Sequence, residues 1–89
     1  MKLYMVLEYF RPGCKARIYE RLSEKGRMLP DGLEYVDSWL EADGDRCFQL
    51  MRAEREALFE TWIREWRDLA DFEIVEIGAK PGADGVEDD

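Results

Sequence analysis

The spacing of the apolar residues switches repeatedly between the period of a strand and that of a helix, and this alternation constrains the fold more than any other feature. Residues 3–10 form a strongly apolar run that stops at Arg11-Pro12-Gly13, which is typical of a strand followed by a turn. Over residues 14–22 apolar side chains recur at every fourth position. This pattern predicts a helix that ends at Gly26.

The second half of the chain predicts two paired strands, a helix and a last strand. Residues 33–42 alternate in polarity, and Asp43-Gly44 separates them from a further strand at 46–52. Residues 54–70 place a broad apolar stripe on one helix face, and residues 72–77 are strand-like. The resulting order predicts an α+β, ferredoxin-like βαββαβ fold, with a four-stranded antiparallel sheet and both helices on one face.

The length permits a single domain. With 89 residues, we expect one folded unit over residues 1–77. Residues 78–89 are rich in glycine and acidic side chains and are expected to form a flexible acidic tail. In the predicted topology, the strand at 46–52 lies between the strands at 3–10 and 33–42.

The composition argues against several classes of function. The chain has no histidine, which excludes serine–histidine and cysteine–histidine triads and disfavours haem. Its two cysteines lie far apart, and no glycine-rich fingerprint is present, so we expect no metal and no cofactor. A net charge of -8 disfavours nucleic acid and anionic membranes. Without a signal peptide or an apolar run of membrane-spanning length, the protein is expected to be soluble and cytoplasmic.

The turn at Asp43-Gly44 permits two registers of the hairpin. A two-residue turn places Trp39 opposite Phe48, whereas a bulge at Gly44 places Trp39 opposite Cys47. We favour the bulged register because it buries no charged side chain beneath the helices. The side covered by the helices then carries Leu3, Met5, Leu7, Tyr9, Val36, Ser38, Leu40, Phe48 and Leu50. The open side carries Tyr4, Val6, Glu8, Phe10, Tyr35, Asp37, Trp39, Cys47, Gln49 and Met51.

An open sheet face that mixes aromatic and polar groups indicates an association surface or a ligand groove. We expect two such sheets to pack face to face as a homodimer that encloses a cavity for a small apolar or aromatic molecule. The expected ligand-binding residues are Tyr4, Tyr35, Trp39, Gln49 and Met51. These rings could instead only fill the dimer interface.

An enzymatic alternative uses carboxylates of the same face. Asp37 or Glu8 could act as the general base of a cofactor-independent isomerase or monooxygenase, with Gln49 or Tyr35 steadying a developing oxyanion. Alternatively, Asp37 and Glu8 have no catalytic role and are two carboxylates near the rim of the sheet that bind arginine side chains or water. Cys47 is expected to be a poor nucleophile, because burial and a neighbouring carboxylate both raise the pKa of a thiol.

The segment at 26–29 also has two interpretations. Gly26 is a possible hinge, and the apolar pair Met28-Leu29 could close over the cavity as a lip. Packing against the preceding helix is the simpler account.

Four segments together resemble a known family. They are residues 3–13 (LYMVLEYFRPG), 25–39 (KGRMLPDGLEYVDSW), 43–51 (DGDRCFQLM) and 62–72 (WIREWRDLADF). They resemble DUF3303, a family of short bacterial proteins without an assigned function. That family is similar in design to the dimeric α+β barrels, which include cofactor-free monooxygenases and isomerases. The resemblance implies a fold and a homodimer, and it implies no reaction and no catalytic residue.

Overall fold

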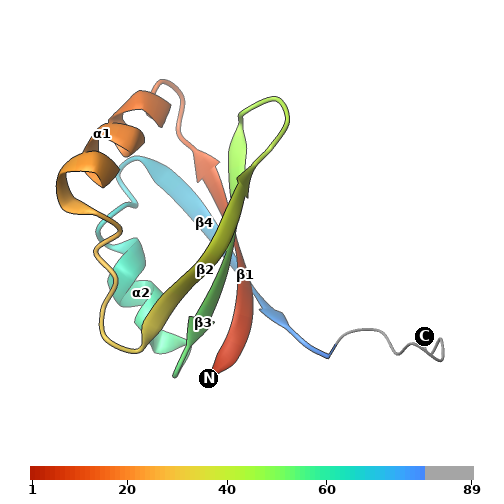
Figure 1. The fold of residues 1–89 in the computed structure, drawn as a ribbon. Helices are drawn as coiled ribbons and strands as arrows, with labels where there is room; N and C mark the ends of the chain where they lie inside the picture. The colour runs from red at the N-terminus through yellow and green to blue at the C-terminus, as the bar shows by residue number, and fades with distance from the viewer. Residues whose placement is uncertain (80–89) are drawn as a thin grey trace.

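The computed structural model describes residues 1–79, which form one antiparallel sheet with both helices on the same side (Figure 1). The elements are β1 (Lys2–Phe10), α1 (Lys15–Lys25), β2 (Leu33–Leu40), β3 (Arg46–Ala53), α2 (Ala57–Ile63) and β4 (Ala70–Ile77). The strand order is β2-β3-β1-β4. The α+β, ferredoxin-like βαββαβ fold is therefore confirmed, as is the position of β3 between β1 and β2. Most of the predicted tail lies outside the described residues.

The ends of the first elements follow the local chemistry of the chain. After β1, the chain turns at Arg11-Pro12-Gly13, where Gly13 has a φ of 74°. Helix α1 ends at Gly26, whose amide donates a hydrogen bond of 2.8 Å to the carbonyl of Leu22. With a φ of 68°, Gly26 adopts a conformation that side chains disfavour, and it directs the chain away from the helix axis.

Helix α2 is shorter than the sequence predicts. The apolar stripe over residues 54–70 indicates one helix, but the helix ends at Ile63. Beyond it the backbone tightens, and the amides of Trp66 and Leu69 donate to carbonyls three residues earlier, each at 2.9 Å. Successive turns of this kind keep every third or fourth side chain on one side, so the spacing of apolar residues does not distinguish them from a helix.

The hairpin register near the turn differs from the favoured one. Trp39 pairs with Phe48, and residues 41–45 connect the two strands. The amide of Glu41 closes this loop by donating to the carbonyl of Arg46 at 2.8 Å. The extra residue is not at Gly44. The ladder shifts instead at Val36, and beyond it Tyr35 pairs with Met51 as the bulged register predicts.

The bulge at Val36 separates side chains that were expected to lie together. Asp37 and Trp39 are in register with Leu50 and Phe48 and face the open side of the sheet. Ser38 is in register with Gln49 and faces the helices. The predicted grouping of Asp37 and Trp39 with Cys47, Gln49 and Met51 is therefore wrong.

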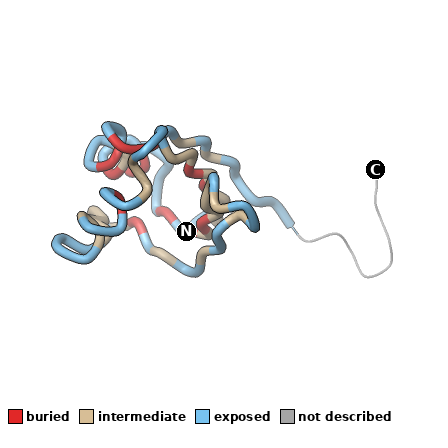
Figure 2. The backbone as a smooth tube through the Cα atoms, turned by 90° about the horizontal axis from the view of Figure 1, so that it is seen from above, coloured by how far each residue is buried: buried red, intermediate tan, exposed pale blue. Residues whose placement is uncertain are grey.

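The two sides of β1 and β3 are also reversed relative to the prediction. The helices cover Tyr4, Val6, Glu8, Gln49 and Met51, all of which are buried, and buried backbone gathers where the helices face the sheet (Figure 2). The polarity argument fails because it treats a buried carboxyl group as unpartnered, whereas the side-chain amide of Gln49 donates a hydrogen bond to Glu8.

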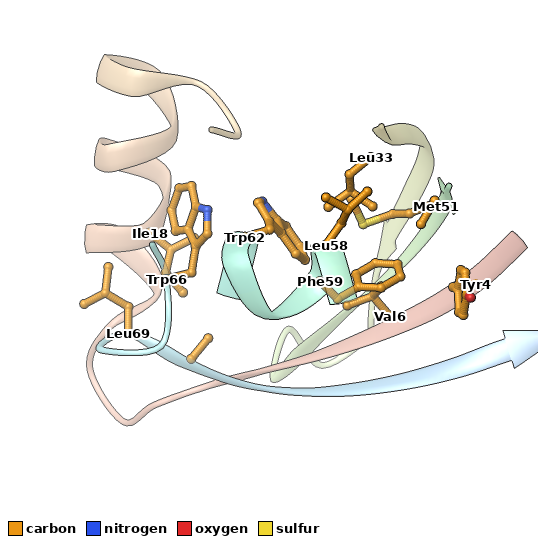
Figure 3. Packing of buried hydrophobic residues seen from close by; sticks show 12 residues of the cluster. Tyr4, Val6, Ile18, Leu33, Met51, Leu58, Phe59, Trp62, Trp66 and Leu69 are labelled. Carbon is orange, nitrogen blue, oxygen red and sulfur yellow. The ribbon is translucent and has the colours of Figure 1, made fainter. Parts of the chain in front are cut away.

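The core is dense beneath α2 (Figure 3). The rings of Tyr4 and Phe59 meet edge to face, with centroids 4.9 Å apart, and Phe59 lies over Val6. By contrast, the only buried residue of α1 is Ile18, which lies beside Trp66. The sheet end that α1 covers is consequently less completely filled.

Candidate functional site

A cavity of about 160 Å³ lies between α1 and the sheet. Its apolar wall consists of Phe10, Ile18, Leu22, Leu40, Trp62 and Trp66. Its polar groups are Glu8, Tyr19, Arg27, Ser38, Cys47 and Gln49. Tyr19 and Leu40 are 47% and 44% exposed, which places them at the mouth. The cavity combines apolar walls with a few convergent polar groups, as binding sites for small molecules do.

The buried polar centre of the cavity is a pair formed by Glu8 of β1 and Gln49 of β3. Their residues are only 6% and 7% exposed, and the Gln49 side-chain amide donates a hydrogen bond of 2.8 Å to Oε1 of Glu8. Burial raises the pKa of Glu8 to about 7, although the Gln49 hydrogen bond and the positive charge of Arg27 oppose this shift. Glu8 can therefore change protonation state near neutral pH.

The other titratable groups of the cavity do not supply a nucleophile. Burial, with a smaller contribution from the charge of Glu8, raises the pKa of the Cys47 thiol to about 11. Burial also raises the pKa of Tyr19, and Cys47 and Glu8 add to that shift. A thiol with so high a pKa is almost entirely protonated near neutrality, and the thiolate is the reactive form. Cys47 thus has the character of an inert lining group.

Residues 26–29, which we call the strap, connect α1 to the turn before β2. The backbone carbonyl of Arg27 accepts hydrogen bonds from both indole N–H groups, at 2.8 Å from Trp62 and 3.1 Å from Trp66. Met28 and Leu29 pack against the core. The guanidinium carbon of Arg27 lies 3.5 Å from the centroid of the Tyr35 ring. The position of the strap is therefore fixed both by hydrogen bonds to its backbone and by contacts of its side chains.

The structure divides the sequence-predicted site residues among four places. Glu8 and Gln49 line the cavity. Tyr35 does not line the cavity but contacts two residues that do: its ring stacks on Arg27, and its hydroxyl is hydrogen-bonded to the Ser38 hydroxyl.

The remaining candidates do not line this cavity. Tyr4 and Met51 are 2% and 0% exposed and belong to the packed core. Asp37 and Trp39 face the other side of the sheet, where Trp39 is 50% exposed. Asp37 accepts a hydrogen bond from the Ser38 amide at 2.8 Å. Asp37 and Glu8 therefore lie on opposite faces of the sheet.

Several cavity residues escaped the sequence analysis, chiefly Arg27, Tyr19 and the two helix-side indoles. The tryptophans carry the spacing of a core stripe, and nothing in that spacing indicates that both indoles bond to one distant carbonyl. A weak signal existed in the strap itself, where apolar Met28-Leu29 follow Gly26 within a loop. That signal indicates a segment that covers the core but does not indicate that Arg27 lines the cavity.

Within residues 1–79, no group of three or more His, Cys, Asp or Glu side chains is arranged to hold a metal ion. The same residues contain no helix with the length and apolar character needed to cross a membrane.

In a comparison with protein families, residues 2–77 match the family described as Domain of unknown function (DUF3303). The chain belongs to this family. The DUF3303 match spans both helices and all four strands and ends with β4. Comparisons with curated proteins and with solved structures found no match. Membership of DUF3303 assigns no activity, so a function has to be inferred from the cavity.

Proposed function

We propose that this protein binds a small, mainly apolar molecule in the cavity between α1 and the sheet. The observation that carries the proposal is a space of about 160 Å³ with six apolar lining residues and a buried Glu8–Gln49 pair. An apolar protein cavity of ~150 Å³ accommodates benzene. The expected ligand is therefore about the size of one substituted six-membered ring, and its polar substituent would meet Glu8.

The proposal is tested with benzyl alcohol as a neutral probe and the indole N–H signals of Trp62 and Trp66 as the NMR readout. Addition of the probe should shift these signals saturably. Leu22→Trp fills the cavity from α1 and should abolish the shifts, whereas Trp39→Ala removes a ring from the opposite face and should leave them unchanged. Binding that survives Leu22→Trp, or that is lost in Trp39→Ala alone, would contradict the proposal.

A second candidate function is general base catalysis by Glu8. It is favoured by one observation, a carboxyl group with a pKa of about 7 inside a cavity. A base poised near neutrality could remove a proton from a substrate that supplies its own reactivity, as in a cofactor-independent isomerase or monooxygenase. Asp37 is not retained in this role because it lies on the opposite face of the sheet.

The catalytic candidate predicts a particular pH profile. For any substrate found to turn over, kcat/KM should rise with pH to a plateau above about pH 7, since only ionised Glu8 accepts a proton. Glu8→Gln should abolish turnover and keep binding of benzyl alcohol. Turnover that is unaffected by Glu8→Gln would exclude Glu8 as the base.

We further propose that the open face of the sheet forms a homodimer interface. Apolar side chains occupy its middle, and several are exposed in one chain, including Trp39 at 50% and Val75 at 41%. Ion pairs surround them, such as Arg46–Glu41 at 3.0 Å and Arg52–Glu34 at 3.3 Å. An apolar centre within a polar rim is the usual anatomy of a protein interface. The cavity lies on the other side of the sheet and remains accessible in such a dimer.

A further inference from the structure

Arg27 is the only cationic residue that lines the cavity within the described part of the chain. Its charge acts on both Glu8 and Cys47 and lowers the pKa of each, so its guanidinium lies close to the polar centre. Within residues 1–79, no ion pair or side-chain hydrogen bond engages this guanidinium. Four other arginines form ion pairs with carboxylates of the same chain: Arg11 with Asp71, Arg21 with Asp68, Arg46 with Glu41 and Arg52 with Glu34.

The position of this unpaired cation is fixed from several directions. Two indole N–H groups hold the carbonyl of Arg27, and the ring of Tyr35 supports its guanidinium at 3.5 Å. On either side of it, Gly26 and Met28 have φ angles of 68° and 59°. A non-glycine residue with positive φ is strained, and such strain persists where the surroundings over-determine the backbone, as in ligand clamps. The strap thus presents a preorganised cation to the cavity.

We infer that the cavity selects a small apolar carboxylate, such as a single-ring aromatic acid in its anionic form, with Arg27 as the residue that binds the anion. This inference rests on the proposed function and names its ligand class. The planar guanidinium can donate two parallel hydrogen bonds to one carboxylate, which an amide or alcohol group of the same size cannot match. The aromatic ring of the ligand then packs against the apolar wall of the cavity.

Glu8 makes this selection dependent on pH. Its Oε1 is occupied by Gln49, so a protonated Glu8 can donate its hydrogen to the bound carboxylate, whereas an ionised Glu8 repels it. The titratable and charged groups that face Glu8 are Arg27 from the strap, Cys47 from β3 and Tyr19 from α1. On β4, the residue paired with Glu8 is the uncharged Phe72. Carboxylate binding should therefore be coupled to proton uptake by Glu8.

The experiment compares benzoate with benzamide, which has nearly the same shape and no charge, by titration calorimetry at about pH 6. The full-length protein should bind benzoate at least about tenfold more tightly, as expected for a charge-assisted hydrogen-bonded pair. Arg27→Gln should remove this preference while benzamide affinity stays unchanged. Arg27→Lys should keep part of it, because the charge remains and the planar fork is lost. Arg17→Gln, which removes an exposed cation from α1, is the matched control and should have no effect.

A second comparison varies the pH. Benzoate affinity should fall between about pH 6 and about pH 8, and Glu8→Gln should abolish that dependence. If benzamide and benzoate bind equally well to the unmodified protein, the carboxylate inference is overturned and the binding cavity stands. If neither probe nor benzyl alcohol binds, the proposed function fails with it. A benzoate preference that survives Arg27→Gln or disappears in Arg17→Gln would overturn the assignment of the anion site to Arg27.

Discussion

A single buried carboxyl group, Glu8, should make the folding stability depend on pH. Its pKa is about 7 in the folded chain and near 4.5 when solvated, so the folded state binds the proton more tightly. This stabilisation is complete below pH 4.5 and is lost as the pH rises to about 7. The free energy of unfolding should therefore decrease across this window, by at most on the order of 3 kcal/mol.

Urea unfolding at several pH values, in the unmodified protein and in Glu8→Gln, isolates this contribution. Glu8→Gln should flatten the decrease between pH 4.5 and 7. Asp37→Asn removes an exposed carboxylate and should leave the decrease in unfolding free energy unchanged. Asp68 does not affect the stability change in this pH window. The hydrogen bond from Arg21 lowers the pKa of Asp68 to about 2, so its contribution to the folding stability is lost only below about pH 4. An equally steep decrease in Glu8→Gln would show that Glu8 is not the group responsible.

The Cys47 thiol should resist alkylation. Because its pKa is raised to about 11, its thiolate fraction at pH 8 is roughly a hundredth of that of a thiol with the ordinary value of 9. Iodoacetamide labelling of a Cys14→Ser variant, followed by mass spectrometry, should be at least about a hundredfold slower in the native protein than in urea. Equal rates in the two conditions would mean that Cys47 is neither buried nor perturbed.

At the scale of elements, α2 and the turns after it are coupled to the strap through one carbonyl. Both indoles donate to the oxygen of Arg27, so either single replacement leaves that oxygen with one partner. Trp62→Phe and Trp66→Phe should each cost about 1 kcal/mol of unfolding free energy for the lost hydrogen bond, plus the lost packing. The double variant leaves the carbonyl without a donor and should lose more than the two single costs added together.

A double-mutant cycle measured by urea unfolding checks this coupling. Trp39→Phe is the matched control, because the Trp39 indole has no hydrogen-bond partner within residues 1–79 and lies half exposed on the open face. It should change stability by well under 1 kcal/mol. Strict additivity of the Trp62 and Trp66 variants would mean that the two indoles do not share the carbonyl.

The order of the elements could be predicted from sequence because it depends on local spacing, whereas the faces of the sheet could not. Polarity alone assigned Glu8 to the open side, since a buried charge is costly. That cost is reduced here by Gln49, which lies on a different strand, and by a raised pKa. The bulge at Val36 could not be predicted either, because the sequence has no glycine at that position. Glu8 and Gln49 were recognised as candidates, but the cavity that unites them with Arg27 depends on contacts between distant segments.

At the scale of the whole molecule, the open face of the sheet and the cavity lie on opposite sides, so assembly and binding should be separable. Met5 lies in the middle of the open face, in register with Leu50 on β3 and Val75 on β4. The proposed homodimer would remove these side chains from water, and a carboxylate at this position would be buried without a partner. The unmodified protein should therefore behave as a dimer of twice 10.5 kDa in sedimentation equilibrium.

Met5→Glu should convert this dimer into a folded monomer that still binds the cavity probe. Arg17→Gln lowers the net charge by the same single unit on the exposed side of α1 and should leave the mass of the dimer unchanged, which controls for the change in net charge. Two-dimensional NMR spectra of Met5→Glu would establish that the monomer is folded, and benzyl alcohol titration would establish that the cavity persists. A dimer that survives Met5→Glu would place the interface elsewhere. Loss of probe binding in a folded Met5→Glu monomer would mean that the cavity depends on the partner chain, contrary to its position beneath α1.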